Sequence, residues 1–253
     1  MLLKILGCGG SRAPGHNSPA FLIDGSLLLD AGTIGAVLSE TEQAAIRTIL
    51  VTHPHLDHVK GIAHLADSKL LSGDMEPVVV VSTKETLSVL REHIFNFKVW
   101  PDFSVLPSAA KGVINWLEIE PEQETVLDGF AVTAIEVNHT LSAVGYRVDR
   151  DKSSILYTGD TGPTRRIWEL AGNPDMLIVE VSFPNEMEEF SIRSGHLTPK
   201  LLALELEKLA KLPGCIRVVH LKHHFAEQIR DELARLGISQ IQVAEDGDVF
   251  VCS

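Results

Sequence analysis

The sequence predicts an α/β protein in which two sheets pack against each other and helices cover their outer faces. Short apolar runs rich in β-branched residues recur from the N-terminus to the C-terminus. Several of these runs precede the first strongly periodic helix. Strand and helix then alternate in each half of the chain, which favours two packed sheets with the helices outside them.

The first half of the chain contains five predicted strands and two predicted helices. Strands are expected at residues 2–6, 20–23, 27–29, 48–51 and 78–81, and helices at 58–70 and 83–93. The N-terminal run is soon ended by Gly7, Gly9 and Gly10, so it indicates a first strand rather than a signal peptide. Residues 96–111 are rich in Pro and aromatic side chains and are expected to form an irregular insertion.

In the second half, predicted strands again alternate with predicted helices. Strands are expected at residues 113–119, 130–137, 143–148, 154–157, 176–179, 217–220, 240–243 and 249–251, and helices at 165–171, 201–212 and 226–236. Thr198-Pro199 is a good helix start, because Thr caps free amide groups and Pro fits the first turn. Gly237 is a good helix stop after residue 236.

Composition and charge narrow the class of protein. The chain has 253 residues, of which 45% are hydrophobic and 22% charged, as in ordinary globular proteins. No long Gly, Ser or Pro linker divides it, so a single domain over residues 1–253 is expected. It carries 22 Lys and Arg against 34 Asp and Glu, a formal charge of −12. A surface of that sign argues against nucleic acid and anionic membranes as partners.

The cysteines and the longest apolar runs indicate the cellular compartment in which the protein is expected. Cys8, Cys215 and Cys252 form no C-x-x-C pair and no disulfide framework, which favours a reducing cytoplasm. The longest apolar stretches fall far below the roughly 18 residues that span a bilayer. We therefore expect a cytoplasmic protein without a membrane partner.

The segment from Val51 to His58 carries the clearest chemical signal. It reads Val-Thr-His-Pro-His-Leu-Asp-His and places three His and one Asp within six residues, after an apolar strand. Alternate side chains of an extended segment point the same way, so His53 and His55 can face one metal. Asp57 and His58 can turn toward a second. The alternative is a set of surface imidazoles or helix caps, but so dense a cluster at one strand end favours metals.

Two metals need more ligands than this segment supplies, and three later strand ends offer them. His139, Asp160 and His220 each follow a run of apolar residues. Their positions place them at the mouth of the layered core, where open α/β architectures usually hold ligands. A lone His after a strand is more often a core or rim residue. Together with the segment from Val51 to His58, these residues favour a metal site.

A motif and three later residues carry a family resemblance: His53-x-His55-x-Asp57-His58, then His139, Asp160 and His220. The set resembles the metallo-β-lactamase superfamily of dinuclear metallohydrolases. Residues 53–62 are similar to the signature of class II 3′,5′-cyclic-nucleotide phosphodiesterases, in the ribonuclease Z-like branch, with supporting matches at 158–163, 180–183 and 194–199. The resemblance implies the four-layer αββα sandwich of the metallo-β-lactamase fold.

The resemblance also implies the ligands of two divalent metal ions. His53, His55 and His139 would bind one metal, Asp57, His58 and His220 would bind the other, and Asp160 would bridge them. A carboxylate suits a bridge because its two oxygens can each meet a cation. His223 and His224 are alternatives to His220, which we prefer because it lies directly at the strand end. A nitrogen and oxygen ligand set suits zinc, and manganese or iron can also occupy it.

Two residues are expected to act in catalysis. Asp57 would orient the attacking hydroxide or take its proton. His196 matches a residue that contacts the phosphate in the phosphodiesterase branch, and it would protonate the leaving oxygen. The alternative role for His196 is structural, as a hydrogen-bonding group at the helix entry with Glu180 or Asp175 as its partner.

A glycine-rich turn after the first strand has two interpretations. Gly7-Cys8-Gly9-Gly10-Ser11 could bring backbone amides to a phosphate, or it could be a tight turn that keeps side chains out of the cleft. His16 and Asn17 lie on the same loop and are candidates to reach a substrate.

The resemblance implies a metal-dependent phosphodiesterase. Its small-molecule substrate would be a 3′,5′-cyclic nucleotide, cAMP or cGMP, hydrolysed to a nucleoside 5′-monophosphate by a metal-bound hydroxide that attacks phosphorus. The first alternative is a ribonuclease Z-like tRNA 3′-processing endonuclease or another phosphodiester hydrolase. No insertion rich in Lys and Arg appears here to grip tRNA, which favours the small substrate. The second alternative is a metal-binding sensor module without turnover. A homodimer is expected from the superfamily alone.

Overall fold

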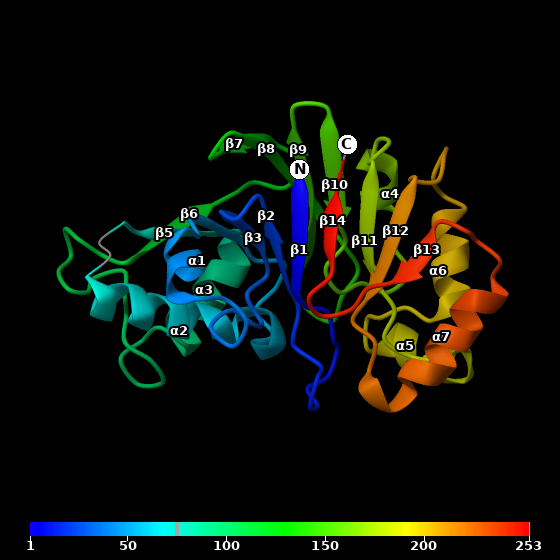
Figure 1. Cartoon of the computed structure of the whole chain (residues 1–253), viewed down its shortest axis with the longest axis horizontal. Coiled ribbons are helices and arrows are strands. Elements are labelled where there is room, and N and C mark those ends of the chain that lie inside the picture. The colour runs from blue at the N-terminus through cyan, green and yellow to red at the C-terminus, as the bar shows by residue number, and fades with distance from the viewer. Residues whose placement is uncertain (74–75, 253) are drawn as a thin grey trace.

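The computed structural model describes residues 1–73 and 76–252. Two seven-stranded sheets pack against each other in it, and helices flank both (Figure 1). The first sheet runs through β14 (Val249–Val251), β1 (Leu2–Gly7), β2 (Ala20–Ile23), β3 (Leu27–Leu29), β4 (Thr48–Leu50), β5 (Val78–Ser82) and β6 (Ile114–Glu118). The second runs through β13 (Ile241–Val243), β12 (Cys215–Val219), β11 (Met176–Glu180), β10 (Ser153–Tyr157), β9 (Val144–Arg150), β8 (Phe130–Glu136) and β7 (Glu124–Leu127).

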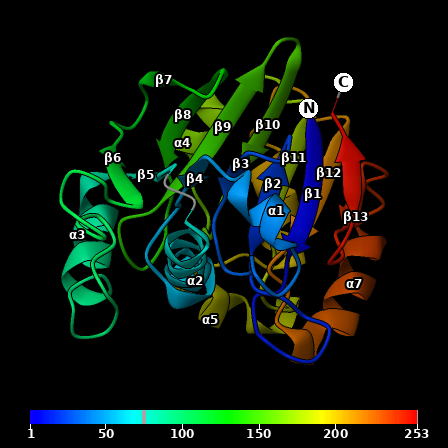
Figure 2. The same cartoon turned by 60° about the vertical axis from the view of Figure 1, so that its left-hand side comes forward.

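The helices form the two outer layers. The first sheet is covered by α1 (Glu40–Ala44), α2 (Leu56–Ser72) and α3 (Lys84–His93), and the second by α4 (Arg166–Leu170), α6 (Pro199–Leu206) and α7 (Ala226–Arg235) (Figures 1 and 2). A further helix, α5 (Glu188–Arg193), lies at the lower end of the sandwich in both views. The predicted αββα sandwich is confirmed.

The central strands β2 and β3 of the first sheet are apolar on both faces because both faces are buried, whereas the edge strands β6 and β14 are partly exposed. All four residues of β2 are buried. Phe21 and Ile23 belong to the core between the sheets, whereas Ala20 and Leu22 belong to the core beneath the helices. The core between the sheets also takes Tyr146 from the second sheet. Because side chains alternate between the two faces of a strand, β2 contributes residues to both cores.

Strand direction brings the site residues to one edge. In the first sheet β3, β4, β5 and β6 are parallel to one another. In the second, β10, β11, β12 and β13 are parallel, and β8 runs with them because β9 is antiparallel to both β8 and β10. The carboxyl ends of the two parallel sets lie at the same end of the sandwich, because residues that follow β4, β8 and β10 come together in one group.

Several predicted boundaries shift in the structure. The helix expected at 58–70 is α2, which begins two residues earlier. The helix expected at 201–212 is the shorter α6, and Thr198 caps it as predicted by accepting a hydrogen bond from the Leu201 amide at 3.3 Å. Leu209 and Leu212 pack against the core after the helix has ended, so their apolar spacing reflects burial of a turn.

Apart from two single-turn 3₁₀ helices (Asn185–Met187 and His223–Phe225), three short elements were not predicted. They are β7, α1 and α5. The side chains of β7 alternate between exposed and half-buried at the edge of the sheet, so its sequence lacks an apolar run. The two helices span five and six residues, too few to show a helical period. Residues 96–111, all of them described, contain no helix or strand, as expected for the predicted insertion.

Helix length and hydropathy bear on whether any helix could span a membrane. Within residues 1–73 and 76–252, no helix combines the length and the apolar character needed to cross a bilayer.

Candidate metal centre

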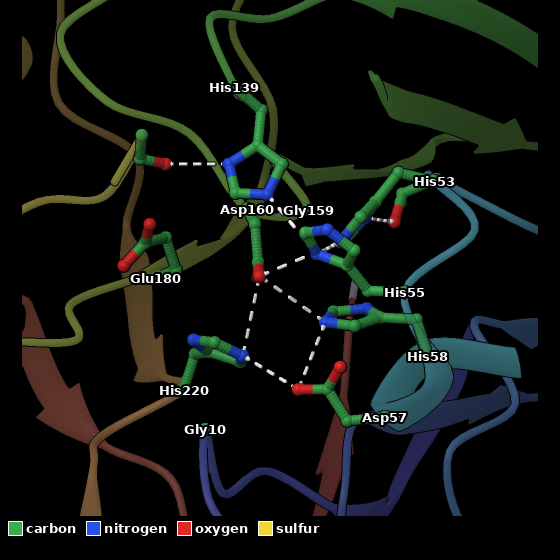
Figure 3. Close-up of polar contacts among 12 residues, drawn as sticks. Gly10, His53, His55, Asp57, His58, His139, Gly159, Asp160, Glu180 and His220 are labelled. Carbon is green, nitrogen blue, oxygen red and sulfur yellow. Dashed lines mark hydrogen bonds and ion pairs between the residues drawn. The ribbon is translucent and has the colours of Figure 1, made fainter. Parts of the chain in front are cut away.

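The seven predicted ligands come from four strand ends. His53 and His55 lie in the loop after β4, and Asp57 and His58 lie in the first turn of α2. The remaining three, His139, Asp160 and His220, follow β8, β10 and β12. The structure brings all seven side chains together, as Figure 3 shows.

The first group consists of His53, His55, His139 and Asp160. His53 Nε2 lies 3.0 Å from His55 Nδ1, and His139 Nε2 lies 3.4 Å from that same atom. One ligand atom from each of the four residues lies within 4.8 Å of the others. Nitrogens held at the usual distances in one tetrahedral zinc sphere lie about 3.3 Å apart, so this spacing suits a single cation.

The second group consists of Asp57, His58 and His220. Asp57 Oδ2 lies 3.5 Å from His220 Nε2 and 3.9 Å from His58 Nε2. Their ligand atoms also lie within 4.8 Å of one another. Both imidazoles are buried, whereas the Asp57 side chain is about one third exposed. Asp57 is therefore the member of this group that can meet a molecule from solvent.

Asp160 connects the two groups through a single atom. Its Oδ2 lies 3.4 Å from His58 Nε2, 3.4 Å from His220 Nε2 and 3.7 Å from His53 Nε2. The sequence analysis expected the two carboxylate oxygens to face one group each. In the structure Oδ2 faces both groups, as Figure 3 shows, and Oδ1 is buried without a hydrogen-bond partner among the described residues.

The residues present fit divalent cations. His58 Nε2, His220 Nε2 and Asp160 Oδ1 are buried and have no hydrogen-bond partner among the described residues. Buried polar atoms are nearly always bonded, so three unpaired atoms in one cluster indicate bonding capacity that a cation would satisfy. Imidazole nitrogens and carboxylate oxygens are ligands that zinc, manganese and iron accept.

Electrostatics favours the ligating form of most of these groups. Burial lowers the pKa values of His53, His55, His139 and His220, which keeps their lone pairs free. Burial opposes the charge of Asp160, but His220 and His58 outweigh it and hold the pKa of this carboxyl well below its ordinary value. Neutral imidazoles and ionised carboxylates are the forms that bind metals.

His58 differs because two carboxylates face it. Burial opposes its protonation, but Asp160 and Asp30 together raise the pKa of the imidazole well above its ordinary value. His58 Nδ1 donates to Asp30 Oδ2 at 2.7 Å, while its Nε2 points at Asp160. A cation bound at Nε2 would replace the proton there, since metal binding to His releases protons.

Asp30 is a site residue that the sequence reasoning missed. It is fully buried directly after β3, in a left-handed conformation with φ of 53°. Besides His58, its carboxylate accepts hydrogen bonds from the Thr52 amide at 2.8 Å and the Tyr157 hydroxyl at 2.8 Å. Such a partner fixes the orientation of the His ring. The signal was available, because Asp30 follows the apolar run 27–29 as Asp160 follows its own strand.

Three other imidazoles are held in the same way. His53 Nδ1 lies 2.9 Å from Thr52 Oγ1, and His139 Nδ1 donates to the Gly195 carbonyl at 2.8 Å. His220 Nδ1 lies 2.8 Å from Ser182 Oγ. In each case the bonded nitrogen leaves Nε2 to face the cluster.

His196 lies beside the second group. Its Nδ1 donates to Glu180 Oε1 at 2.7 Å, so Glu180 is the partner that the sequence analysis considered, whereas Asp175 bonds Ser154 instead. The His196 ring stacks on His220 at 5.4 Å between centroids. Burial opposes protonation of His196, but Glu180 overcomes it and raises the pKa of the ring. One ligand atom each of His196, Asp160 and His220 lies within 4.8 Å of the others.

The glycine-rich turn packs against the site. A Cβ atom at Gly10 would lie 2.1 Å from the His220 carbonyl oxygen, so only glycine permits this approach. The interpretation as a tight turn therefore accounts for Gly10, and Figure 3 shows it next to His220. His223, one of the alternatives to His220, bonds Ser11 Oγ through Nδ1 at 2.8 Å. Within the described residues, neither His223 nor His224 joins a ligand group.

Comparison with known proteins places this geometry in a family. A profile of the beta-lactamase superfamily domain matches residues 25–223. A Yersinia pestis protein named "Probable 3′,5′-cyclic-nucleotide phosphodiesterase" is 27% identical over 228 residues, which cover 80% of this chain and 64% of that protein. Ribonuclease Z of Methanosarcina acetivorans is 24% identical over 304 residues, which cover 96% of this chain and 95% of that protein. The chain thus spans just under two thirds of the Yersinia protein.

Solved structures agree on the fold. Unliganded yeast PDE1 superposes with a TM-score of 0.81 over 98% of both chains, at 18% sequence identity. The predicted resemblance to this family and its fold is confirmed. The chain belongs to the beta-lactamase superfamily, has the metallo-β-lactamase fold, and carries a His and Asp cluster suited to divalent metal ions.

Proposed function

We propose that this chain is a phosphodiesterase that works with two divalent cations and hydrolyses 3′,5′-cyclic nucleotides. The observation that carries the proposal is the pair of ligand groups that share Asp160, with the hydrogen-bonded pair of His196 and Glu180 beside them. In this proposal His53, His55 and His139 hold one cation. Asp57, His58 and His220 hold the other. When bound, such cations neutralise charge on a phosphoryl group and make water a nucleophile at neutral pH.

The chain's own residues supply the proton transfers. Water adds to phosphorus, the bond from phosphorus to the 3′ oxygen breaks, and that oxygen takes a proton. In this proposal His196 gives the proton, and the bond between its Nδ1 and Glu180, which leaves Nε2 as the other donor, supports that role. Asp57 orients the attacking water or takes its proton, since its partly exposed carboxylate lies at the mouth of the cluster.

The choice of substrate draws on charge and on the named relatives. Proteins named as cyclic-nucleotide phosphodiesterases and as ribonuclease Z both match this chain at low identity. A tRNA enzyme needs a basic surface to grip phosphates. The chain has a formal net charge of −12, and the only basic residues in its irregular segment 96–111 are Lys98 and Lys111. A small cyclic nucleotide needs only the cations and a few donors, which favours it as the substrate.

One specific observation supports ribonuclease Z-like processing as the second candidate. The Methanosarcina protein matches over nearly the full length of both chains, whereas the Yersinia protein is longer than this chain. The two candidates share the proposed site and differ in what lies beyond the scissile phosphate.

A substrate panel tests the proposal. The metal-loaded protein is incubated with cyclic AMP, cyclic GMP, a 2′,3′-cyclic nucleotide, an aryl phosphodiester and precursor tRNA. Release of 5′-monophosphates from the 3′,5′-cyclic nucleotides is the expected result. Turnover of the aryl diester without cyclic-nucleotide hydrolysis would reject the substrate and keep the reaction class, and specific cleavage of precursor tRNA would favour the second candidate.

Asp57→Ala tests the chemistry at the site. We expect loss of turnover with an intact fold, checked by circular dichroism and by metal content. Asp231→Ala is the matched control, because it removes an exposed carboxylate from α7, away from the cluster. A rate equal to that of the unaltered protein at matched metal occupancy would reject the role of Asp57.

A further inference from the structure

A cavity next to the metal centre has no role in the proposed function. Its volume is about 280 Å³ and its lining includes Arg12, Asn17, Thr33, Lys60 and His64. The glycines Gly32, Gly35 and Gly61 form part of its wall. We call it the Arg12–Lys60 cavity. Asn17 belongs to the loop that the sequence analysis named as a candidate to reach a substrate.

The charge of the Arg12–Lys60 cavity is opposite to that of the chain. Two of its lining residues are basic and none is acidic, although acids outnumber bases by 34 to 22 in the sequence. Among the described residues, no ion pair joins either Arg12 or Lys60 to a carboxylate. Asp57 acts on Lys60 from outside the lining without forming an ion pair, so the lining itself is cationic and favours an anionic ligand.

Both basic side chains have donors to spare. The Lys60 ammonium donates one hydrogen bond, to Ser18 Oγ, out of three available. The guanidinium of Arg12 has five N–H groups, and the structure gives it no hydrogen-bond acceptor within the described residues. A phosphate oxygen could accept from both, since Arg and Lys are the usual phosphate binders.

The cavity shares a wall with the metal centre. Lys60 lies one helical turn beyond Asp57 on α2, so the two side chains are neighbours on one face. The loop after β3 is pressed against the same turn, because a Cβ at Gly32 would lie 1.9 Å from the Asp57 carbonyl oxygen. In addition, the Gly61 amide donates to the Ala31 carbonyl at 2.7 Å. The Arg12–Lys60 cavity is therefore adjacent to the turn that carries Asp57, although Asp57 itself is not part of its lining.

We propose that the Arg12–Lys60 cavity binds a second phosphate group, distinct from the phosphate that would be hydrolysed. The group can belong to a phosphodiester that carries a second phosphate, such as a dinucleotide with a 5′-phosphate, or it can be free inorganic phosphate. A 3′,5′-cyclic nucleotide has a single phosphate and would leave this cavity free. Only the kinetic part of this proposal rests on the proposed phosphodiesterase activity. Binding of the second phosphate requires the two basic side chains and no reaction.

Calorimetric titration of the metal-free protein tests the binding directly. The probes are the dinucleotide ApA, which has one phosphate, its 5′-phosphorylated form pApA, and inorganic phosphate. We expect pApA to bind about tenfold or more tightly than ApA, because a charge-assisted hydrogen bond contributes that much. Lys60→Gln and Arg12→Gln should each remove most of this difference, and Lys60→Arg should retain it.

Matched controls separate local from long-range charge. Lys84→Gln and Arg91→Gln remove the same charges from α3, whose positions 84 and 91 are exposed, and should leave the preference for pApA unchanged. Inorganic phosphate that binds only when Arg12 and Lys60 are present would also support the proposal and identify a free ion as the ligand. Equal affinity for ApA and pApA, together with no such phosphate binding, would overturn it.

Kinetics of the metal-loaded protein then distinguishes the two proposals. A higher kcat/KM for pApA than for ApA, lost in Lys60→Gln, is the expected result if the second phosphate belongs to the substrate. If pApA binds more tightly than ApA but cyclic nucleotides are not hydrolysed, the phosphate-binding proposal is supported and the proposed substrate is rejected. If cyclic AMP is hydrolysed and no probe depends on Arg12 or Lys60, the cavity proposal fails alone.

Discussion

At the scale of single residues, the site depends on side chains that hold the ligands as well as on the ligands. His58, His139 and His220 each face the cluster with Nε2 while Nδ1 is bonded elsewhere. Asp30 is the most connected of these partners, because one carboxylate receives bonds from His58, Thr52 and Tyr157. Loss of such a partner releases the ring without removing a ligand.

Asp30→Asn should therefore weaken metal binding without abolishing it. We expect a loss of about 10- to 100-fold in affinity for the cation at His58, because the neutral amide has one acceptor oxygen in place of the two that bond His58, Thr52 and Tyr157. Competition with a chromophoric chelator measures the affinity. Tyr157→Phe removes one donor to the same carboxylate and should have a smaller effect. An affinity for Asp30→Asn equal to that of the unaltered protein would exclude the positioning role.

His196→Ala should separate catalysis from metal binding. The variant should keep both metals and lose about 10²- to 10⁴-fold in kcat, the usual contribution of a general acid. Metal analysis together with steady-state rates on a cyclic nucleotide checks this. Glu180→Gln should give an intermediate rate, because the imidazole stays but its charged partner is lost. Loss of a metal from His196→Ala would instead show that this residue is a ligand.

At the scale of elements, the sequence predicted elements with a long apolar pattern and missed those fixed by a few polar contacts. The ends of β4, β8, β10 and β12 were predicted to within one residue because each apolar run stops near a polar residue. The helix α1 could not be predicted from periodicity, since it spans five residues and depends on the capping box between Ser39 and Glu42. The sharing of Asp160 Oδ2 depends on how two sheets meet, which no local pattern records.

The capping box makes α1 sensitive to acid. Hydrogen bonds from the Ser39 backbone and from Lys4 lower the pKa of Glu42 to about 2. A carboxyl whose pKa is lowered by folding stabilises the protein above its unfolded pKa, and this contribution is lost as the pH falls toward the folded value. Glu42→Gln should thus reduce the free energy of unfolding at about pH 7 and less at about pH 3.5.

Urea titrations of Glu42→Gln and the unaltered protein at both pH values measure this difference. Glu40→Gln is the control, because Glu40 lies in the same turn but makes no capping bond in the described structure. We expect a small effect, since Glu42 is exposed to solvent. A difference that is unchanged or larger at acidic pH would contradict the assignment.

At the scale of the whole molecule, the two sheets share both a core and a metal site. Phe21 of the first sheet and Tyr157 of the second lie in edge contact, with ring centroids 4.9 Å apart. Four predicted ligands follow the single strand β4 of the first sheet, and His139, Asp160 and His220 follow three strands of the second. Separation of the halves would expose this core and divide the ligands, so the halves should unfold together.

Calorimetry should therefore record a single unfolding transition, both with and without metal. Bound cations stabilise the folded chain, by about 4 kcal/mol per site when the free metal exceeds its Kd a thousandfold. The transition should move to higher temperature when zinc or manganese is added and return when a chelator removes it. His220→Ala should give a smaller increase, because the second group loses one ligand while the first keeps its own. Two separate transitions, only one of them moved by metal, would show that the sheets fold as independent domains.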